Sequence, residues 1–338
     1  MVCPQSVPLS TVTTRITSRK AYQGLLLGRG DTDVVAVQDK LILSTGRHPL
    51  APYLLMDLSY TQQKAAYDHR IGIDNFMFGA ANLCTYLARP GEGSRMSRIF
   101  ICPQPFPFPI VDAVSREVTP SSEYTNRMGF NPALDYQGIK YSATNPAPNY
   151  ACGAAEYGKF QYEGVQAKRE IVLTHNGVVL VMDRIRTDGN YIGRHSAGVI
   201  YQIWPSRQRE DPKTRWVVQS PHAGTAVTRD GAVRNEFSTL FYIPPVGTPT
   251  TTALRTDPKS PSAKLSRAFC AWTDLEKHSV VNILSLIIPL QDSAKAAELI
   301  GSITITEKEG SYRVRIPCAP EDIQVLFSPR QEPRCGCL

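Results

Sequence analysis

The sequence predicts an all-β protein, in the form of a large antiparallel sandwich of two packed sheets. Short runs rich in β-branched and aromatic residues recur along the chain, separated by Gly, Pro, Asn and Asp. The 26 prolines in 338 residues argue against a helical protein, because proline interrupts both helices and central strands. Only residues 293–300 (SAKAAELI) have a helical pattern, with Ser293 expected as the N-cap and Gly301 as the end.

In the first part of the chain, short apolar runs bounded by turn residues predict strands at 22–27, 34–37, 40–44, 53–58, 75–80 and 97–102. Alternating prolines over 103–109 exclude both a helix and a central strand. Residues 115–160 are rich in Tyr, Asn, Pro and Gly, so we expect a long ordered loop system there with only short strands.

Two β-branched runs, 165–174 and 177–185, meet at His175-Asn176-Gly177, and an Asn-Gly turn between such runs is a strong hairpin signal. Further strands are predicted at 198–204, 215–219, 224–228, 237–243, 266–273, 279–289, 302–307, 312–317 and 324–328. We therefore expect an N-terminal extension (1–20), a β domain (21–329) that has a subdivision near 103–160, and a cysteine-containing tail (330–338).

The formal charge is +7 and the pI is near 9.0, which suits either a mildly basic protein or one with an anionic partner. The basic residues are scattered singly along expected strands rather than in blocks, which favours an acidic polysaccharide over nucleic acid. No apolar run approaches eighteen residues, so no membrane-spanning helix is expected. The start of the chain lacks a signal-peptide pattern, and the compartment stays open.

The eight cysteines have neither CxxC pairs nor zinc-ribbon spacing, and Cys84, Cys102 and Cys270 lie in apolar runs that predict core positions. No phosphate-binding loop, serine-nucleophile elbow or dinucleotide fingerprint is present, so no cofactor is expected.

The runs Lys168-Arg169-Glu170-Ile171-Val172-Leu173 and Val178-Val179-Leu180-Val181-Met182-Asp183-Arg184-Ile185 resemble a hairpin of heparinase II/III-type polysaccharide lyases. Four further regions are similar to the same β domain, in the same order: 30–46, 73–78, 281–290 and 302–327. The resemblance implies the large β-supersandwich that follows a helical toroid in those enzymes. No long helical region that would form such a toroid is visible in the sequence.

The chain departs from that family where many of its members hold a metal ion. The matched positions carry Arg29 or Gly30 in place of a catalytic histidine, Ser44 or Thr45 in place of an aspartate, and Asp74 in place of a second histidine. A zinc-like site needs several converging imidazoles or carboxylates. We therefore expect no metal site at these positions.

Elimination from a uronate needs a group that neutralises the carboxylate, a base and an acid. Tyr67, His69 and Arg70 lie close together in the sequence and supply all three types, although an ordinary polar surface loop has the same composition. His195 falls where the family often has a histidine beside a strand, and a structural role is favoured for it over a catalytic one.

Aromatic and basic residues in the loops also match a binding surface. They are Arg47, His48, Tyr60, Tyr124, Arg127, Tyr141 and Tyr157. Tyrosine rings stack on sugars and arginines bind carboxylates, but the same residues also build protein–protein interfaces or pack loops onto sheets. All three uses remain open.

The sequence thus predicts a lyase-like β-sandwich that is catalytically degenerate and acts as a structural or assembly component, or binds acidic polysaccharide. One alternative is an active polysaccharide lyase that works with a helical partner or a missing domain. A second alternative is a jelly-roll coat protein of a virus.

Overall fold

The computed structural model describes most of the second half of the chain and parts of the first. The described residues are 13–17, 40–45, 51–57, 71–79, 81–82, 97–104, 139–147, 150–158, 160, 162–203, 209–211, 215–228, 231–255, 267–318, 321–329 and 331–335. The first two predicted strands, 22–27 and 34–37, lie outside these residues.

Three antiparallel sheets make up the described fold. Sheet A has the order β1-β2-β3-β4-β6-β11-β16-β15, with β5 paired to β4. Its strands are β1 (Thr13–Thr17), β2 (Lys40–Ser44), β3 (Tyr53–Asp57), β4 (Gly72–Phe78), β5 (Ala81–Asn82), β6 (Ser97–Pro103), β11 (His195–Ile203), β15 (Thr251–Arg255) and β16 (Arg267–Leu275).

Sheet B has the order β12-β13-β14-β17-β10-β9-β8-β7. Its strands are β7 (Ile139–Ala147), β8 (Tyr150–Tyr157), β9 (Val165–Thr174), β10 (Val179–Thr187), β12 (Arg209–Asp211), β13 (Trp216–Thr228), β14 (Gly231–Tyr242) and β17 (Val280–Leu290). Sheet C, in the order β18-β19-β20-β21, contains β18 (Thr304–Lys308), β19 (Ser311–Ile316), β20 (Ile323–Ser328) and β21 (Gln331–Cys335).

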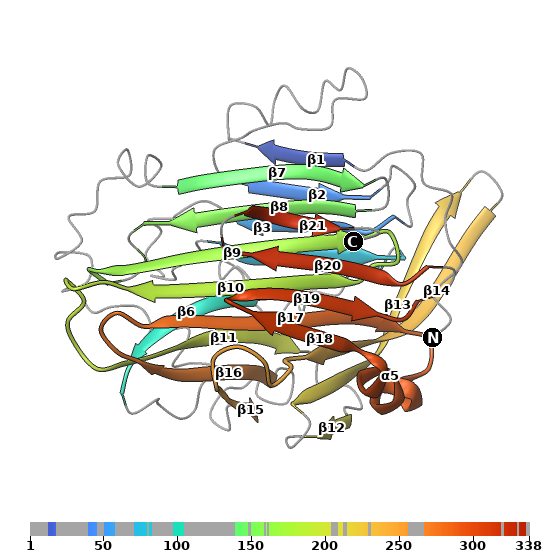
Figure 1. The fold of residues 1–338 in the computed structure, drawn as a ribbon. Coiled ribbons are helices and arrows are strands. Elements are labelled where there is room, and N and C mark those ends of the chain that lie inside the picture. Colours follow the sequence, from blue (N-terminus) through green and yellow to red (C-terminus); the bar gives the residue numbers. More distant parts are fainter. Residues whose placement is uncertain are drawn as a thin grey trace, which may run out of the picture.

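The sheets form three layers, with sheet B in the middle and sheet C in front of it in Figure 1. Consecutive residues of β10 alternate between two cores: Val179 and Val181 belong to the core between sheets A and B, Leu180 and Met182 to the core between sheets B and C. We call these the A/B core and the B/C core. Because both faces of sheet B are covered, its central strands read as continuous apolar runs instead of an alternating pattern.

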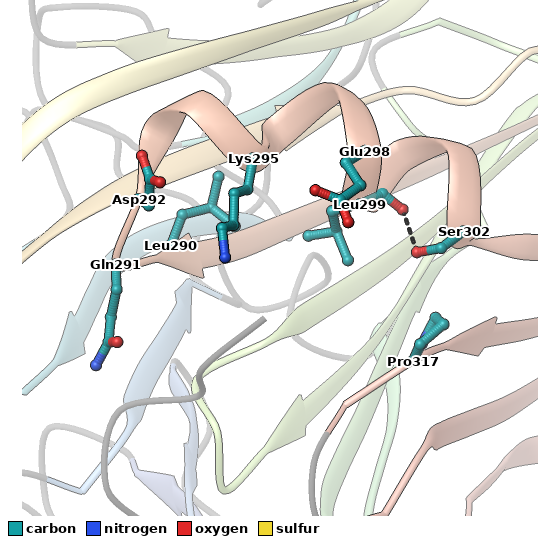
Figure 2. Close-up of a pocket in the computed structure, with 8 residues that line it drawn as sticks. All are labelled: Leu290, Gln291, Asp292, Lys295, Glu298, Leu299, Ser302 and Pro317. Atoms are coloured by element: carbon teal, nitrogen blue, oxygen red, sulfur yellow. Dashed lines mark hydrogen bonds between the residues drawn. The ribbon is translucent and has the colours of Figure 1, made fainter.

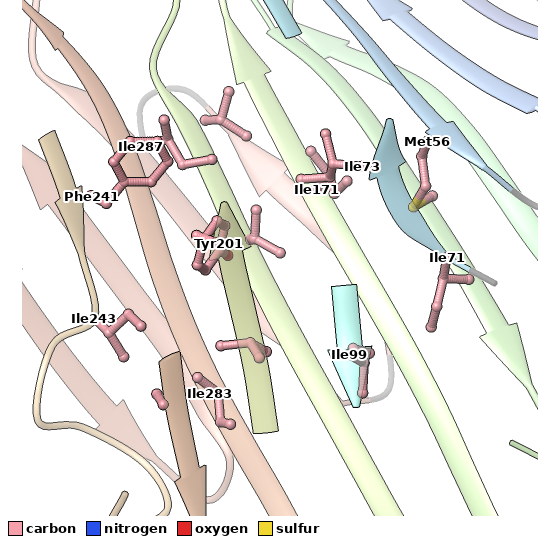
Figure 3. Packing of buried hydrophobic residues seen from close by; sticks show 14 of the residues in the cluster. Met56, Ile71, Ile73, Ile99, Ile171, Tyr201, Phe241, Ile243, Ile283 and Ile287 are labelled. Carbon is pink, nitrogen blue, oxygen red and sulfur yellow. The ribbon is translucent and has the colours of Figure 1, made fainter. Parts of the chain in front are cut away.

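The A/B core is built from the facing sides of the two large sheets. Ile73 and Ile99 of sheet A meet Ile171, Ile283 and Ile287 of sheet B in this layer, as Figure 3 shows. These side chains are almost fully buried. Burying one such aliphatic side chain stabilises the fold by about 1.5–3 kcal/mol, so this layer supplies much of the stability of the sandwich.

The structure confirms the all-β sandwich and adds a third layer. Strands β18, β19 and β20, which were predicted as strands of the sandwich, form part of the separate sheet C. Among the described residues, the one α-helix is α5 (Ala296–Ser302), which follows a 3₁₀ turn, η1 (Ser293–Lys295). Its predicted ends were wrong: Asp292 accepts the capping hydrogen bond from the backbone of Ala294, and Gly301 lies inside the helix.

Residues 115–160 include two strands that are longer than expected, β7 and β8. The sequence of β8, YACGAAEY, is poor in β-branched residues, so its strand propensity is low. Pairing with β9 and burial of both faces outweigh that propensity. Similarly, the two strands expected at 215–219 and 224–228 form one strand, β13, which is interrupted by a register shift between Gln219 and His222.

The β9–β10 hairpin forms where the Asn-Gly turn predicts it. The backbone N–H of Gly177 donates to the carbonyl of Thr174, 3.0 Å away, and Gly177 has a φ of 73°. A Cβ atom at Gly177 would lie 2.4 Å from the ring of Phe78 in sheet A. Glycine is therefore required twice, for its positive φ and for the close approach of the aromatic ring.

Segments at the predicted domain limits also take part in the sheets. β1 lies within residues 1–20 and pairs with β2, while β21 lies in the C-terminal tail and pairs with β20. Cys102 and Cys270 are buried free thiols, as expected for core cysteines, whereas Cys84 lies outside the described residues. Within the described ranges, no helix is long and apolar enough to cross a membrane.

Candidate functional site

Most residues that the sequence singled out lie outside the described residues. These are Arg47, His48, Tyr60, Tyr67, His69, Arg70, Tyr124 and Arg127. Tyr141 lies on β7 opposite Ala155. Tyr157 is 3% exposed and belongs to the A/B core, with its ring centroid 6.4 Å from that of Phe160. The burial of Tyr157 fits a role in packing rather than in binding a sugar or a protein partner.

Two charged residues of the β9–β10 hairpin form a buried ion pair on the face toward the A/B core. Arg169 and Asp183 lie directly opposite each other, with Nε–Oδ1 and Nη2–Oδ2 distances of 2.6 and 2.9 Å. Nη1 of Arg169 also donates to the carbonyl of Ile71, the residue before β4, at 2.9 Å and to that of Ser97 on β6 at 3.5 Å. Arg169 therefore connects sheet B to sheet A across the A/B core.

Ile71 has a φ of 51°, a backbone conformation that β-branched residues rarely adopt. The hydrogen bond from Arg169 to its carbonyl helps to hold this conformation, because the guanidinium would otherwise keep an unpaired donor in the core. Burial raises the pKa of Asp183, and the adjacent Arg169 opposes that shift.

The opposite face of the same hairpin carries a second ionic network. Nε of Arg184 lies 2.9 Å from Oε2 of Glu170, and Nζ of Lys168 lies 3.0 Å from Oε1 of the same carboxylate. Arg184 also donates to the carbonyl of Gly310 at 3.0 Å and lies 5.8 Å from the ring centre of Tyr312. This network ties sheet B to sheet C.

These five charged side chains are the ones that carry the resemblance to the lyase hairpin. Each is held by partners inside the molecule, so the arrangement stabilises three layers and leaves no free acid or base for a substrate. The sequence offered a signal for these ion pairs: the charged runs 168–170 (KRE) and 183–184 (DR) lie within apolar segments. Charges that are buried require partners of opposite charge.

A second group of titratable side chains in contact with one another is formed by Tyr162, Tyr191 and His195. The hydroxyl of Tyr191 lies 2.8 Å from Nδ1 of His195, and the ring centroids of Tyr162 and His195 are 4.1 Å apart. Burial lowers the pKa of His195 and raises those of Tyr162 and Tyr191 to about 12. All three side chains are therefore neutral near pH 7.

The imidazole of His195 is enclosed by its neighbours. A Cβ atom on Gly193 would lie 2.5 Å from Cε1 of His195, so the backbone of residue 193 covers one edge of the ring. Tyr162 lies against the ring and Tyr191 occupies Nδ1. The geometry supports a structural role, in which the histidine fixes the segment that leads into β11.

A cavity of about 330 Å³ lies beside α5 at the end of β17 (Figure 2). Leu290, Leu299 and Pro317 give it an apolar part, and the charged groups around it are Asp292, Lys295 and Glu298. Asp292 is used as the helix cap, and the hydroxyl of Ser302 donates to the carbonyl of Leu299. The cavity can hold a small polar molecule, but it lacks a nucleophile paired with a base.

Among the residues that the structure describes, no group of three or more His, Cys, Asp and Glu side chains is placed to hold a metal ion. Asp74 lies on β4, between Ile73 and Asn75, where the pairing of β4 with β3 has a register shift.

Comparison with known proteins finds similarity in structure only: no protein-family model and no curated protein match the sequence. The crystal structure of heparan sulfate lyase HepC from Pedobacter heparinus aligns with a TM-score of 0.53 and 12% identity, over 86% of this chain and 41% of that one. A crystal structure of heparinase III aligns with a TM-score of 0.48 and 10% identity, over 89% and 43%. The chain thus spans about two fifths of the length of these two proteins. The alignment with HepC shows that the β-sandwich fold is shared with part of that enzyme.

Proposed function

We propose that this chain is a non-catalytic, lyase-like β-sandwich that binds acidic polysaccharide. The observation that carries the proposal is a net charge of +7 on a fold shared with part of a heparan sulfate lyase. A polyanionic sugar chain is attracted by such a charge, and the attraction weakens with salt. Because the likeness covers 41% of that enzyme, its activity is not transferred with the fold.

Two features support binding without elimination chemistry. The three positions matched to metal ligands carry Arg29 or Gly30, Ser44 or Thr45, and Asp74. His195, the one histidine beside a tyrosine hydroxyl in the described part of the chain, is enclosed and engaged through Nδ1. A general base must reach the proton that it removes, and this side chain is only 8% exposed.

The test is to incubate the protein with heparin, alginate and hyaluronan and to follow both binding and the absorbance of unsaturated uronates. We expect salt-sensitive binding to at least one of the three, with no gain in absorbance. A gain in absorbance would show an active lyase and would contradict the non-catalytic part. If none of the three binds at low ionic strength, the proposed function is wrong.

A second candidate function, self-assembly, is favoured by the far half of the β13–β14 hairpin. Residues 223–228 and 231–236 pair only with each other among the described strands, and Figure 1 shows this arm projecting at the edge of the sheets. Val233 on the arm is 37% exposed. Strand pairs with open edges are templates for pairing with another chain. A mass in solution that corresponds to one 37.4 kDa chain at all concentrations would exclude this function.

A further inference from the structure

The outward face of strands β18, β19 and β20 carries three cationic side chains, and the outward positions of these strands hold no carboxylate. In β19, Tyr312, Val314 and Ile316 point into the B/C core, so the residues between them point outward. Pairing with β19 places Lys308 of β18 on the same outward face as Arg313 and Arg315. Every other outward position of β18, β19 and β20 holds Thr, Ser, Gln or Leu.

The three cations form a row. Lys308 lies opposite Ser311, and Arg313 and Arg315 follow at successive outward positions of the same strand. Outward positions of a strand repeat about every 6.6 Å, so the row extends over about 13 Å. The row runs along the front layer of the molecule in Figure 1, where β18 and β19 lie side by side.

The nearby carboxylates leave most of this charge uncompensated. Glu307 turns away from the face: it accepts from the hydroxyl of Tyr312 at 2.9 Å and from the backbone N–H of Gly247 at 3.0 Å. Asp322 pairs with Arg315, which is still 58% exposed. Lys308 and Arg313 form no ion pair with any described residue, and Glu309 lies in the turn beyond the row.

Protection of a sheet edge does not account for this pattern. Lysine on an edge strand discourages unwanted pairing, and β18 is such a strand. Arg313 and Arg315, however, lie on β19, which is paired on both sides. Ordinary surfaces also mix charges of both signs. A row of three cations, two of them on an inner strand and only one paired with a described carboxylate, is better explained by an anionic partner.

We infer that the outward face of β18–β20 is the surface on which an extended acidic polysaccharide lies, with Lys308, Arg313 and Arg315 bound to its carboxylate or sulfate groups. This inference rests on the proposed function and gives it a location. The hydroxyl and amide side chains between the cations are suited to sugar hydroxyls. Binding of single-stranded nucleic acid relies on exposed aromatic rings, and none occupies an outward position of these three strands.

The experiment uses the full chain and size-defined heparin oligosaccharides, with dissociation constants measured at low salt and in 0.5 M salt. The test variant is Lys308→Gln with Arg313→Gln. The matched control is Lys277→Gln with Arg194→Gln, which removes two exposed cations from other parts of the surface. We expect the test variant to bind roughly ten-fold more weakly at low salt, and the control to bind almost as tightly as the unmodified protein.

The outcomes separate the location from the function. If the unmodified protein binds heparin but both double variants lose affinity equally, the effect is one of net charge and the inferred surface is wrong. If the unmodified protein binds none of heparin, alginate and hyaluronan, the proposed function fails as well. Tighter binding of a single-stranded DNA of matched charge, lost in the test variant, would overturn the polysaccharide assignment. Thermal unfolding of each variant verifies that these exposed substitutions leave the fold intact.

Discussion

Arg169 and Asp183 face each other across the β9–β10 hairpin in the middle of the molecule, joined by two parallel hydrogen bonds of 2.6 and 2.9 Å. Both side chains are fully buried, and the guanidinium also donates to the carbonyl of Ile71, the residue before β4 of the neighbouring sheet. One residue further along each strand, Glu170 and Arg184 pair on the other face. Two strands thus place one ion pair in each core, so the same hairpin holds all three layers together.

Breaking the ion pair between Arg169 and Asp183 should be strongly destabilising. Asp183→Asn leaves the Arg169 cation buried without a counter-charge, and we expect the free energy of unfolding to fall by about 3–5 kcal/mol in urea titrations. The double variant Arg169→Met with Asp183→Leu should lose less than Asp183→Asn alone, because no uncompensated charge remains. The exposed pair is the comparison: Arg315→Gln should cost at most about 1 kcal/mol. Equal losses for Asp183→Asn and Arg315→Gln would contradict this view of the hairpin.

The enclosed imidazole of His195 makes stability depend on pH. Burial lowers its folded-state pKa below the unfolded value of about 6.5, so the unfolded chain binds the proton more readily. Its contribution is complete above that value and is lost as the pH falls through it. In His195→Phe the decline in unfolding free energy from pH 7.5 to pH 5 should be shallower.

His278→Asn, in the exposed turn between β16 and β17, serves as the control for the removal of an imidazole. His175, whose pKa is also lowered by burial, accounts for part of the slope that remains. An identical slope in His195→Phe and the unmodified protein would show that His195 titrates freely in the fold.

The turn of the central hairpin tests the packing between sheets A and B. Gly177→Ala places a Cβ atom 2.4 Å from the ring of Phe78 and imposes a side chain on a φ of 73°. We expect a loss of about 2–4 kcal/mol in unfolding free energy, from strain in the turn and from displacement of the ring. Gly301→Ala is the control, because a Cβ atom there meets nothing within 4 Å and the helix favours alanine. A drop in midpoint temperature for Gly301→Ala as large as that for Gly177→Ala would be inconsistent with this explanation.

Cys102 should resist modification in the native protein. It lies on β6, and burial raises the pKa of its thiol to about 12. Since the thiolate is the reactive form, iodoacetamide at pH 8 should leave the peptide that contains Cys102 unlabelled for hours, whereas labelling in urea should be complete within minutes. Peptide mass spectrometry gives the site directly. Rapid labelling of Cys102 without denaturant would show that sheet A opens readily around β6.

The sequence alone predicted the class of fold, most of the longer strands of the second half and the central hairpin, because these depend on local patterns. The short strands β12 and β15 and the C-terminal strand β21 were missed. The strand 165–174 has the predicted bounds, and the turn at Asn176-Gly177 needs only residues next to it. The resemblance that rested on KRE and DR also agrees with the fold likeness to a heparan sulfate lyase. Most candidate site residues stay predictions, since they lie outside the described residues.

The tertiary structure decided which face each strand presents and what covers it. The continuous apolar runs of β9, β10 and β17 are typical of strands covered on both faces, but they do not show which element covers each face. For this reason the sequence showed neither sheet C as a third layer nor the row of cations on its outward face. Arg169 donates a hydrogen bond to Ile71, 98 residues away in the chain, and Arg184 donates one to Gly310, 126 residues away. Contacts over such separations follow from the packing of whole sheets, which no local pattern encodes.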